Sequence, residues 1–292
     1  MISSRPSFSF RSRTDARVAL VLAVLAGAAA LIALLVLGFL LREAQPLLHD
    51  GGWRALLGGD GWHPLEGHFG LSPMFWATVL AAAGAILVAA PLGLASAVFE
   101  RFYAGRSVQR LHRAMLGLLA GVPSVVYGLW GLTVVVPLIA DRHPPGASLL
   151  AAILILALMI LPTIALTSAS ALAAVSPNWL QGAAALGLPR RAVILGVAIP
   201  AARGGILAGV LLAIARALGE TMAVLMVSGN VVQVPASVFE PVRVLTANIA
   251  LEMAYATGTH RAGLFASGLA LATLVLALAV VGARLSRSPR HA

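Results

Sequence analysis

Two charged residues interrupt a long apolar stretch in the second half of the chain. Arg216 and Glu220 both fall inside the run 204–228, four positions apart, so they would share one helix face and could form an ion pair. Because a charge at the centre of a bilayer costs about 3 kcal/mol, the pair should face a bundle interior or an aqueous path. A planar guanidinium donates two hydrogen bonds to an oxyanion. The pattern therefore predicts a path in which a passing anion displaces the Glu220 carboxylate, with a purely structural ion pair as the alternative.

Hydroxyl side chains in the same apolar runs are the next candidates. Thr221 follows Glu220 directly, and Ser124 lies in another apolar run. Both are predicted to line the path, although hydroxyls in membrane helices more often bond a neighbouring helix. His63 and His68 lie in a polar segment without a third close ligand, so a solvated loop is favoured there over a metal site.

A short motif in the longest polar loop has the residue types of a docking element. Ser176 and Pro177 are start signals for a helix, and Gly187 followed by Pro189 is a stop signal. The stretch between them has little side-chain bulk and holds Gln181, Gly182, Ala183 and Ala184. Another protein's groove could approach this backbone closely, whereas the alternative is a connector on the membrane surface. A second short run is expected to end at Pro200.

Residue types that the chain lacks narrow its chemistry. All 20 basic residues are Arg, so the chain has no Walker A loop, which needs a Lys to hold phosphates. It has no Cys and therefore neither disulfides nor thiolate metal sites. We expect no catalytic residues and no cofactor in this chain.

The elements that must position these residues are membrane helices. Of the 292 residues, 60% are hydrophobic and 10% charged, with mean hydropathy +0.96, whereas about a quarter of a soluble domain is charged. The sequence predicts an all-α, polytopic fold with one membrane domain, 18–284, between the tails 1–17 and 285–292. The expected spans are 18–41, 72–99, 114–140, 147–173, 204–228 and 262–283, with the docking loop at 174–203.

The placement of the Arg residues predicts the orientation in the membrane. Fourteen of the 20 lie in the two tails and in the loops after the second and fourth spans, and five lie on the opposite side. Because cytoplasmic loops carry the excess of basic residues, both termini are expected in the cytoplasm of a bacterial cell, with the protein in its inner membrane. The net charge of +10 is thus explained by topology, and the expected surroundings are lipid and not nucleic acid.

The docking loop resembles the cytoplasmic motif of ABC importer permeases. That motif reads Glu-Ala-Ala, three residues, Gly, nine residues and Ile-x-Leu-Pro. The matching positions are Gln181-Gly182-Ala183, Gly187 and Val197-Ala198-Ile199-Pro200, with Gln181 in place of the usual Glu. The resemblance implies a type I ABC importer permease fold in which this helix docks on an ATPase subunit.

Two further strings resemble the phosphate permeases of the PstC and PstA type. They are 215–230, which contains Arg-Ala-Leu-Gly-Glu-Thr-Met, and 121–129, which reads Gly-Val-Pro-Ser-Val-Val-Tyr-Gly-Leu. The resemblance implies a subunit that moves inorganic phosphate into the cytoplasm by alternating access. It also implies three partners: a PstB-like ATPase dimer that uses ATP and Mg²⁺, a PstA-like second permease, and a periplasmic PstS-like phosphate-binding protein.

Three other functions are kept as alternatives. A permease for sulfate or molybdate would share the docking motif but would not be expected to carry the string around Arg216. An integral-membrane enzyme acting on lipid phosphate would need acids, bases or metal ligands clustered near one face. A structural scaffold or regulator would not require a buried charge pair.

Overall fold

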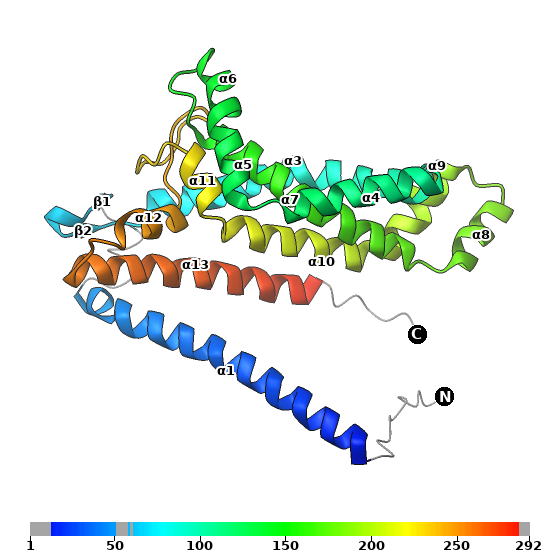
Figure 1. The fold of residues 1–292 in the computed structure, drawn as a ribbon, viewed down its shortest axis with the longest axis horizontal. Coiled ribbons are helices and arrows are strands. Elements are labelled where there is room, and N and C mark those ends of the chain that lie inside the picture. Colours follow the sequence, from blue (N-terminus) through cyan, green and yellow to red (C-terminus); the bar gives the residue numbers. More distant parts are fainter. Residues whose placement is uncertain (1–12, 51–57, 59–60, 286–292) are drawn as a thin grey trace.

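The structure is a computed structural model that describes residues 13–50, 58 and 61–285, and these form a helical bundle with one small hairpin (Figure 1). The long helices are α1 (Arg13–Asp50), α3 (Ser72–Phe102), α7 (Leu149–Ala173), α10 (Ile199–Leu218) and α13 (Gly258–Leu285). The shorter helices are α4 (Arg106–Gly121), α5 (Ser124–Trp130), α6 (Val136–Ala140), α8 (Pro177–Ala185), α9 (Arg190–Val193), α11 (Met222–Val227) and α12 (Leu245–Glu252).

The described helices provide five candidate membrane spans, or six if one bent pair is counted as a span. Within the described ranges, five segments are long and apolar enough to cross a membrane, and a bent pair, Arg106–Gly121 with Ser124–Ala140, makes a sixth. The five are Asp15–Leu48, Ser72–Phe102, Leu149–Ala173, Arg190–Leu218 and Gly258–Gly282. The all-α, polytopic fold with about six spans is confirmed.

Two of the expected spans are not single helices. The span expected at 114–140 bends by 91°, because Val122 and Pro123 are extended between α4 and α5. A residue that precedes a proline is disfavoured in the helical conformation, which places the bend here. The span expected at 204–228 starts earlier, at Arg190, and ends at Leu218.

The run that leads to Pro200 does not end there, contrary to expectation. A π-helical segment, Ile194–Ala198, joins α9 to α10, and the helix continues through Pro200. A second π-helical segment, Gly131–Val135, precedes Pro137 in the same way. A proline cannot donate the helical hydrogen bond, and the wider turn before it lets the helix continue.

Helix α7 forms the centre of the bundle, between α3 and α10. Its residues Leu156, Ile160 and Ile164 are at most 1% exposed. Small residues on α3 face α7, and at Gly93 a Cβ atom would lie 2.9 Å from the Ile164 side chain. Close approach through small residues is the usual way in which membrane helices pack. The three helices therefore provide the rigid frame on which the remaining elements are placed.

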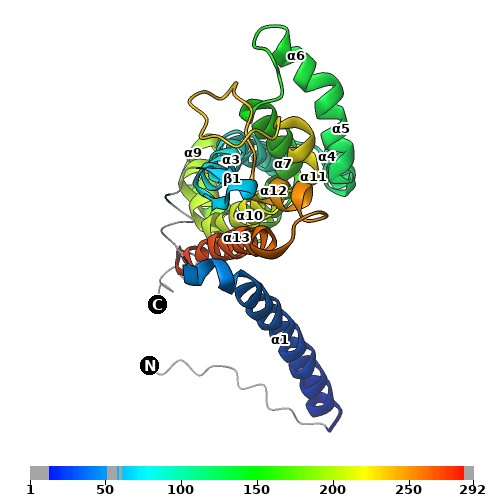
Figure 2. The same cartoon turned by 90° about the vertical axis from the view of Figure 1, so that its left-hand side faces the viewer.

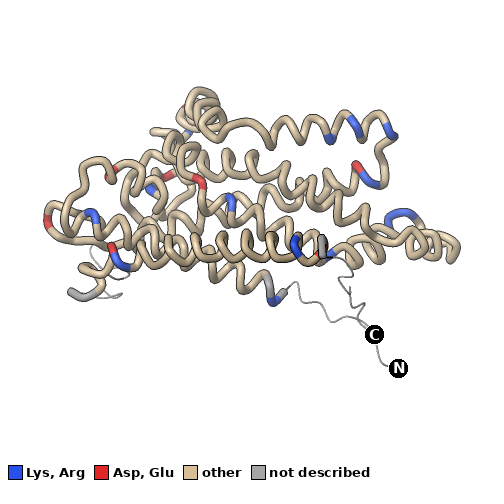
Figure 3. The backbone as a smooth tube through the Cα atoms, turned by 60° about the horizontal axis from the view of Figure 1, so that its bottom comes forward, with Lys and Arg blue, Asp and Glu red and all other residues tan. Residues whose placement is uncertain are grey.

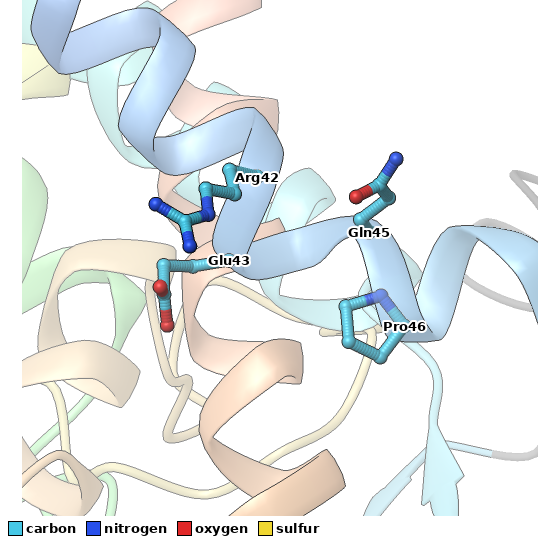
Figure 4. Close-up of a pocket in the computed structure, with 4 residues that line it drawn as sticks. All are labelled: Arg42, Glu43, Gln45 and Pro46. Carbon is cyan, nitrogen blue, oxygen red and sulfur yellow. The ribbon is translucent and has the colours of Figure 1, made fainter.

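Helix α1 leaves this frame. It runs beyond the expected end at residue 41 and turns near Pro46, where Arg42, Glu43, Gln45 and Pro46 line an open hollow (Figure 4). Near its end Phe39 meets Phe265 of α13 at 5.5 Å between ring centroids. No residue in the most apolar 18-residue stretch of α1 is buried. Both α1 and the α5–α6 arm project from the bundle (Figure 2).

The two ends of the molecule differ. Strands β1 (Trp62–His63) and β2 (His68–Phe69) pair antiparallel with His63 opposite His68, and they lie beside α12 at what we call the hairpin end. Helices α8 and α9 lie at the opposite end, the α8 end (Figure 1). The Arg13 end of α1 and the Leu285 end of α13 point toward the α8 end. Most charged residues lie toward one end or the other, and few lie between (Figure 3).

Candidate functional site

The predicted anion path centres on a break between two helices. Helix α10 ends at Leu218, and residues 219–221 separate it from α11. The Glu220 Oε1 atom accepts a hydrogen bond from the Ala223 N–H at 3.2 Å and so satisfies a donor that the start of α11 leaves free. The expected ion pair of Arg216 with Glu220 is therefore wrong. The helix ends before Glu220, and no ion pair joins the two residues in the described part of the chain.

Arg216 lies in the last turn of α10, on its exposed face. The exposed positions of this face are Gly205, Ala208, Leu212 and Arg216. The adjoining face is buried and consists of Ala202, Ile206, Gly209, Ala213 and Ala217. The two strings singled out in the sequence meet nearby, because Gly128 of α5 lies against Ala223 of α11. The guanidinium is thus presented without a carboxylate partner among the described residues.

Helices α5 and α11 pack closely through glycines. At Gly128 a Cβ atom would lie 2.9 Å from the Ala223 Cα atom, and at Gly131 it would lie 2.8 Å from the Val227 side chain. The two contacts advance together along both helices, so α5 and α11 run parallel. Ser124, the first residue of α5, is therefore level with the break that contains Thr221. Both residues are half-buried.

Helix α8 has the start and the stop that its sequence predicts. Pro177 is its first residue, and Gly187, at φ +80°, follows its C-cap. The Gly187 N–H donates to the Ala184 carbonyl at 3.0 Å, and the Leu188 N–H donates to the Ala183 carbonyl at 3.3 Å. This pair of bonds is the Schellman motif, in which a left-handed glycine closes the helix.

The residues expected to contact an ATPase divide into two groups. Gln181, Gly182 and Ala184 are exposed on α8, whereas Ala183 faces inward and is buried. Gly187 is exposed at the end of the helix. Pro200 is also exposed but belongs to the start of α10, beyond α9 and the π-helical segment. Among the residues of the predicted docking element, the exposed ones on α8 and its closing turn therefore lie together, and Pro200 lies apart from them.

Sequence reasoning missed a buried carboxylate at Glu100, near the end of α3. Its side chain accepts from Arg113 Nε at 2.9 Å and lies 3.0 Å from His112 Nδ1, and His112 Nε2 lies 2.9 Å from Ser96 Oγ. The order of Ser96, His112 and Glu100 is that of a hydrolytic triad. However, acyl transfer also needs donors for an oxyanion, and N–H groups within a helix already donate to carbonyls four residues back. The group therefore fastens α4 to α3.

A second buried group was also missed, at the hairpin end. The Glu252 carboxylate accepts from Arg243 Nη1 at 2.6 Å and from Trp62 Nε1 at 2.8 Å, and it lies 2.8 Å from His260 Nε2. Arg243 also donates from Nη1 to Asn248 Oδ1 at 3.1 Å. These residues, which we call the Glu252 group, join the hairpin, α12 and α13. Trp62 lies 190 positions from Glu252, so no local spacing could have indicated the contact.

The chain is similar to proteins of one transport family. Residues 89–291 match the family described as "Binding-protein-dependent transport system inner membrane component". The phosphate transport system permease protein PstC of Mesorhizobium japonicum is 35% identical, over 93% of this chain and 92% of the relative. PstC of Haemophilus influenzae is 32% identical, over 85% and 89% of the two chains.

The fold agrees with these matches. A crystal structure of a bacterial ABC transporter involved in the import of the acidic polysaccharide alginate superimposes with a TM-score of 0.61 at 14% identity, covering 91% of this chain and 96% of that one. Such a likeness shows the permease fold without showing what is carried. The chain thus belongs to the inner-membrane components of binding-protein-dependent transport systems, and its fold is that of a type I ABC importer permease.

Proposed function

We propose that this chain is a permease subunit through which an ABC importer passes inorganic phosphate into the cytoplasm by alternating access. The names of its PstC relatives support phosphate as the substrate. The observation that carries the proposal is Arg216, a guanidinium without a carboxylate partner among the described residues, on an exposed face beside a break in a membrane helix. Broken helices are where transporters bind their substrates.

An anion can bind beside the broken helix more favourably than beside the continuous helix that the sequence predicts. The Glu220 carboxylate is engaged with the Ala223 N–H at the start of α11 and forms no ion pair with Arg216. An entering phosphate then meets the planar guanidinium of Arg216, which can donate two hydrogen bonds to it. Ser124 and Thr221, at the starts of α5 and α11, are the hydroxyls that we assign to the same path.

The partners follow from the same proposal. The exposed side of α8, with Gln181, Gly182, Ala184 and Gly187, docks on a PstB-like ATPase, which binds ATP and Mg²⁺ and exists as a dimer. A PstA-like permease completes the path, and a PstS-like protein delivers phosphate to the hairpin end. In this arrangement the α8 end and both termini are cytoplasmic, which agrees with the excess of Arg in the expected cytoplasmic segments.

Replacing Arg216 tests the proposal. Arg216→Gln should lower phosphate uptake into vesicles by at least about 30-fold, because hydrogen bonds to a charged group contribute roughly 2 kcal/mol or more. Arg216→Lys should recover only part of the loss, since an ammonium lacks the planar arrangement of donors. Arg142→Gln removes an exposed Arg of the turn after α6 and serves as the matched control.

Two results would count against this function. One is normal uptake by assembled complexes that carry Arg216→Gln. The other is recovery of uptake when Glu220→Gln is added to Arg216→Gln, because rescue by neutralising both charges indicates a structural pair. We expect no rescue, since Glu220 bonds to the start of α11 and not to Arg216.

A further inference from the structure

The break after α10 leaves backbone groups that need partners. At membrane depth an unsatisfied carbonyl is costly, so irregular backbone persists only where other groups bond to it. The Glu220 carbonyl receives its hydrogen bond from the hydroxyl of Thr246, at 2.8 Å. Thr246 belongs to α12, which lies 26 positions further along the chain, and it is 7% exposed. A side chain from outside the broken span therefore supports the break.

The first turn of α12 is also fixed from the opposite side. The Leu245 N–H donates to Thr78 Oγ1 at 3.0 Å, and that hydroxyl donates in turn to the Met74 carbonyl at 2.7 Å. Thr78 and Met74 lie on α3 and are buried in the rigid frame. Two threonine hydroxyls thus hold the start of α12 between α3 and the break.

The last turn of α12 ends in the Glu252 group. Asn248 and Glu252, both on α12, accept hydrogen bonds from Arg243, and Glu252 also accepts from Trp62 of the hairpin. The eight-residue helix is therefore tied at one end to the surface of the hairpin end and at the other to the backbone beside Arg216. Helix α12 therefore gives a displacement of the hairpin end a short route to the break, beside the bond from Arg243 Nε to the Asn230 carbonyl after α11.

We propose that Thr246 is a positioning residue of the transport path. Through the Glu220 carbonyl its hydroxyl fixes where α10 ends, and thereby where Arg216 is presented, and it passes the position of α12 to that point. The part of this inference that concerns phosphate rests on the proposed function. The part that concerns the end of α10 does not.

A cysteine introduced at the break can report, through its rate of labelling, whether the end of α10 has moved. The chain has no Cys, and at Gly219 a Cβ atom would meet nothing closer than 3.6 Å, so Gly219→Cys introduces one reporter without a clash. Labelling of this chain by a charged thiol reagent is followed by mass in the assembled complex. Phosphate uptake is measured in parallel on the same Thr246 variants without the reporter.

Thr246→Val removes the hydroxyl and keeps the shape of the side chain. It should raise the labelling rate at residue 219 about tenfold, the change that corresponds to losing one buried hydrogen bond, and lower uptake at saturating phosphate. Thr246→Ser keeps the hydroxyl and should restore both. Thr273→Val is the matched control, because among the described residues that hydroxyl bonds only within its own helix, to the Leu269 carbonyl. Thr78→Val releases α12 from α3 and should act in the same direction, so it replaces Thr246→Val if the latter does not assemble.

The outcomes separate this inference from the proposed function. Unchanged labelling and uptake in Thr246→Val, or equal losses in the Val and Ser variants, would overturn the role of Thr246 even if Arg216→Gln abolishes uptake. Increased labelling in Thr246→Val together with normal uptake in Arg216→Gln would uphold the placement of α10 and reject Arg216 as the phosphate contact.

Discussion

Glu100 is a charged residue enclosed at the junction of two helices. It is 1% exposed, and its carboxylate accepts from Arg113 and faces His112, both on α4. Glu100→Gln keeps the shape of the side chain and removes the charge. We expect it to lower the free energy of unfolding by about 2 kcal/mol, the scale of a hydrogen bond to a charged group, because Arg113 and His112 lose the charge and one of the two acceptor oxygens that they share.

Thermal unfolding of the purified complex measures this effect. Glu66→Gln on the exposed tip of the hairpin is the control and should change the unfolding midpoint little. Equal midpoints for the Glu100→Gln and Glu66→Gln variants would show that the carboxylate does not fasten α4 to α3.

Residue types in the sequence were sufficient to find Arg216 but not its surroundings. A charge in an apolar run is visible without a structure, because lipid makes it costly. The pairing with Glu220 failed because spacing of four implies one face only while the helix continues. Two residues decide the outcome: Gly219 caps α10, and Glu220 bonds to Ala223 of the next helix. A competing local hydrogen bond of this kind leaves no mark in hydrophobic periodicity.

At the scale of elements, the end of α8 depends on one backbone conformation. Gly187 has φ +80°, and nothing lies within 4 Å of where its Cβ atom would be, so any effect of substitution comes from the backbone and not from crowding. Gly187→Val should weaken binding-protein-stimulated ATP hydrolysis by about tenfold, because the left-handed conformation costs an ordinary residue roughly 1–2 kcal/mol. Gly187→Asn should retain most of the activity, since Asn adopts this conformation more readily.

Assembly must be followed in the same variants. A Gly187→Val complex that assembles and hydrolyses ATP as the parent does would remove α8 from the coupling contact. Loss of activity in both the Val and Asn variants would indicate that the contact needs a position without a side chain, and not the left-handed turn.

Start and stop signals predict α8 well and the spans less well. Pro177 and Gly187 act through their own backbone geometry, so their effect is readable from the sequence. Pro123 and Pro200 have the same residue type and opposite outcomes. Before Pro123 the chain turns by 91°, whereas before Pro200 a π-helical segment lets the helix continue. Packing of the flanking helices selects between a bend and a wider turn, and packing is not encoded in a local string.

At the scale of the whole molecule, the two ends make the proposed orientation testable. His63 of the hairpin and Gln181 of α8 are both exposed and lie at opposite ends of the bundle. With the α8 end in the cytoplasm, a membrane-impermeant thiol reagent added to intact cells should label His63→Cys and not Gln181→Cys. After the cells are opened, both should react. Labelling of Gln181→Cys from outside would reverse the orientation.

The number of spans followed from composition, because lipid requires apolar helices of a minimum length. The tertiary polar contacts did not follow. Trp62 is 4% exposed and donates to Glu252, 190 positions further along the chain. Contacts between segments so distant in the chain are determined by the assembled bundle.

The surplus length of α1 has a mechanical consequence. Its candidate span Asp15–Leu48 has 34 residues, and the uncharged run 18–41 within it is about 36 Å long as a helix, against a hydrocarbon layer of roughly 30 Å. The excess requires inclination, and Figure 1 shows α1 diverging from α13 toward the α8 end. Since no residue in the most apolar 18-residue stretch of α1 is buried, the angle of this part of the helix can change without repacking α3, α7 or α10. Helix α1 is therefore the part of the chain that can accommodate thicker and thinner bilayers while the substrate path keeps its shape.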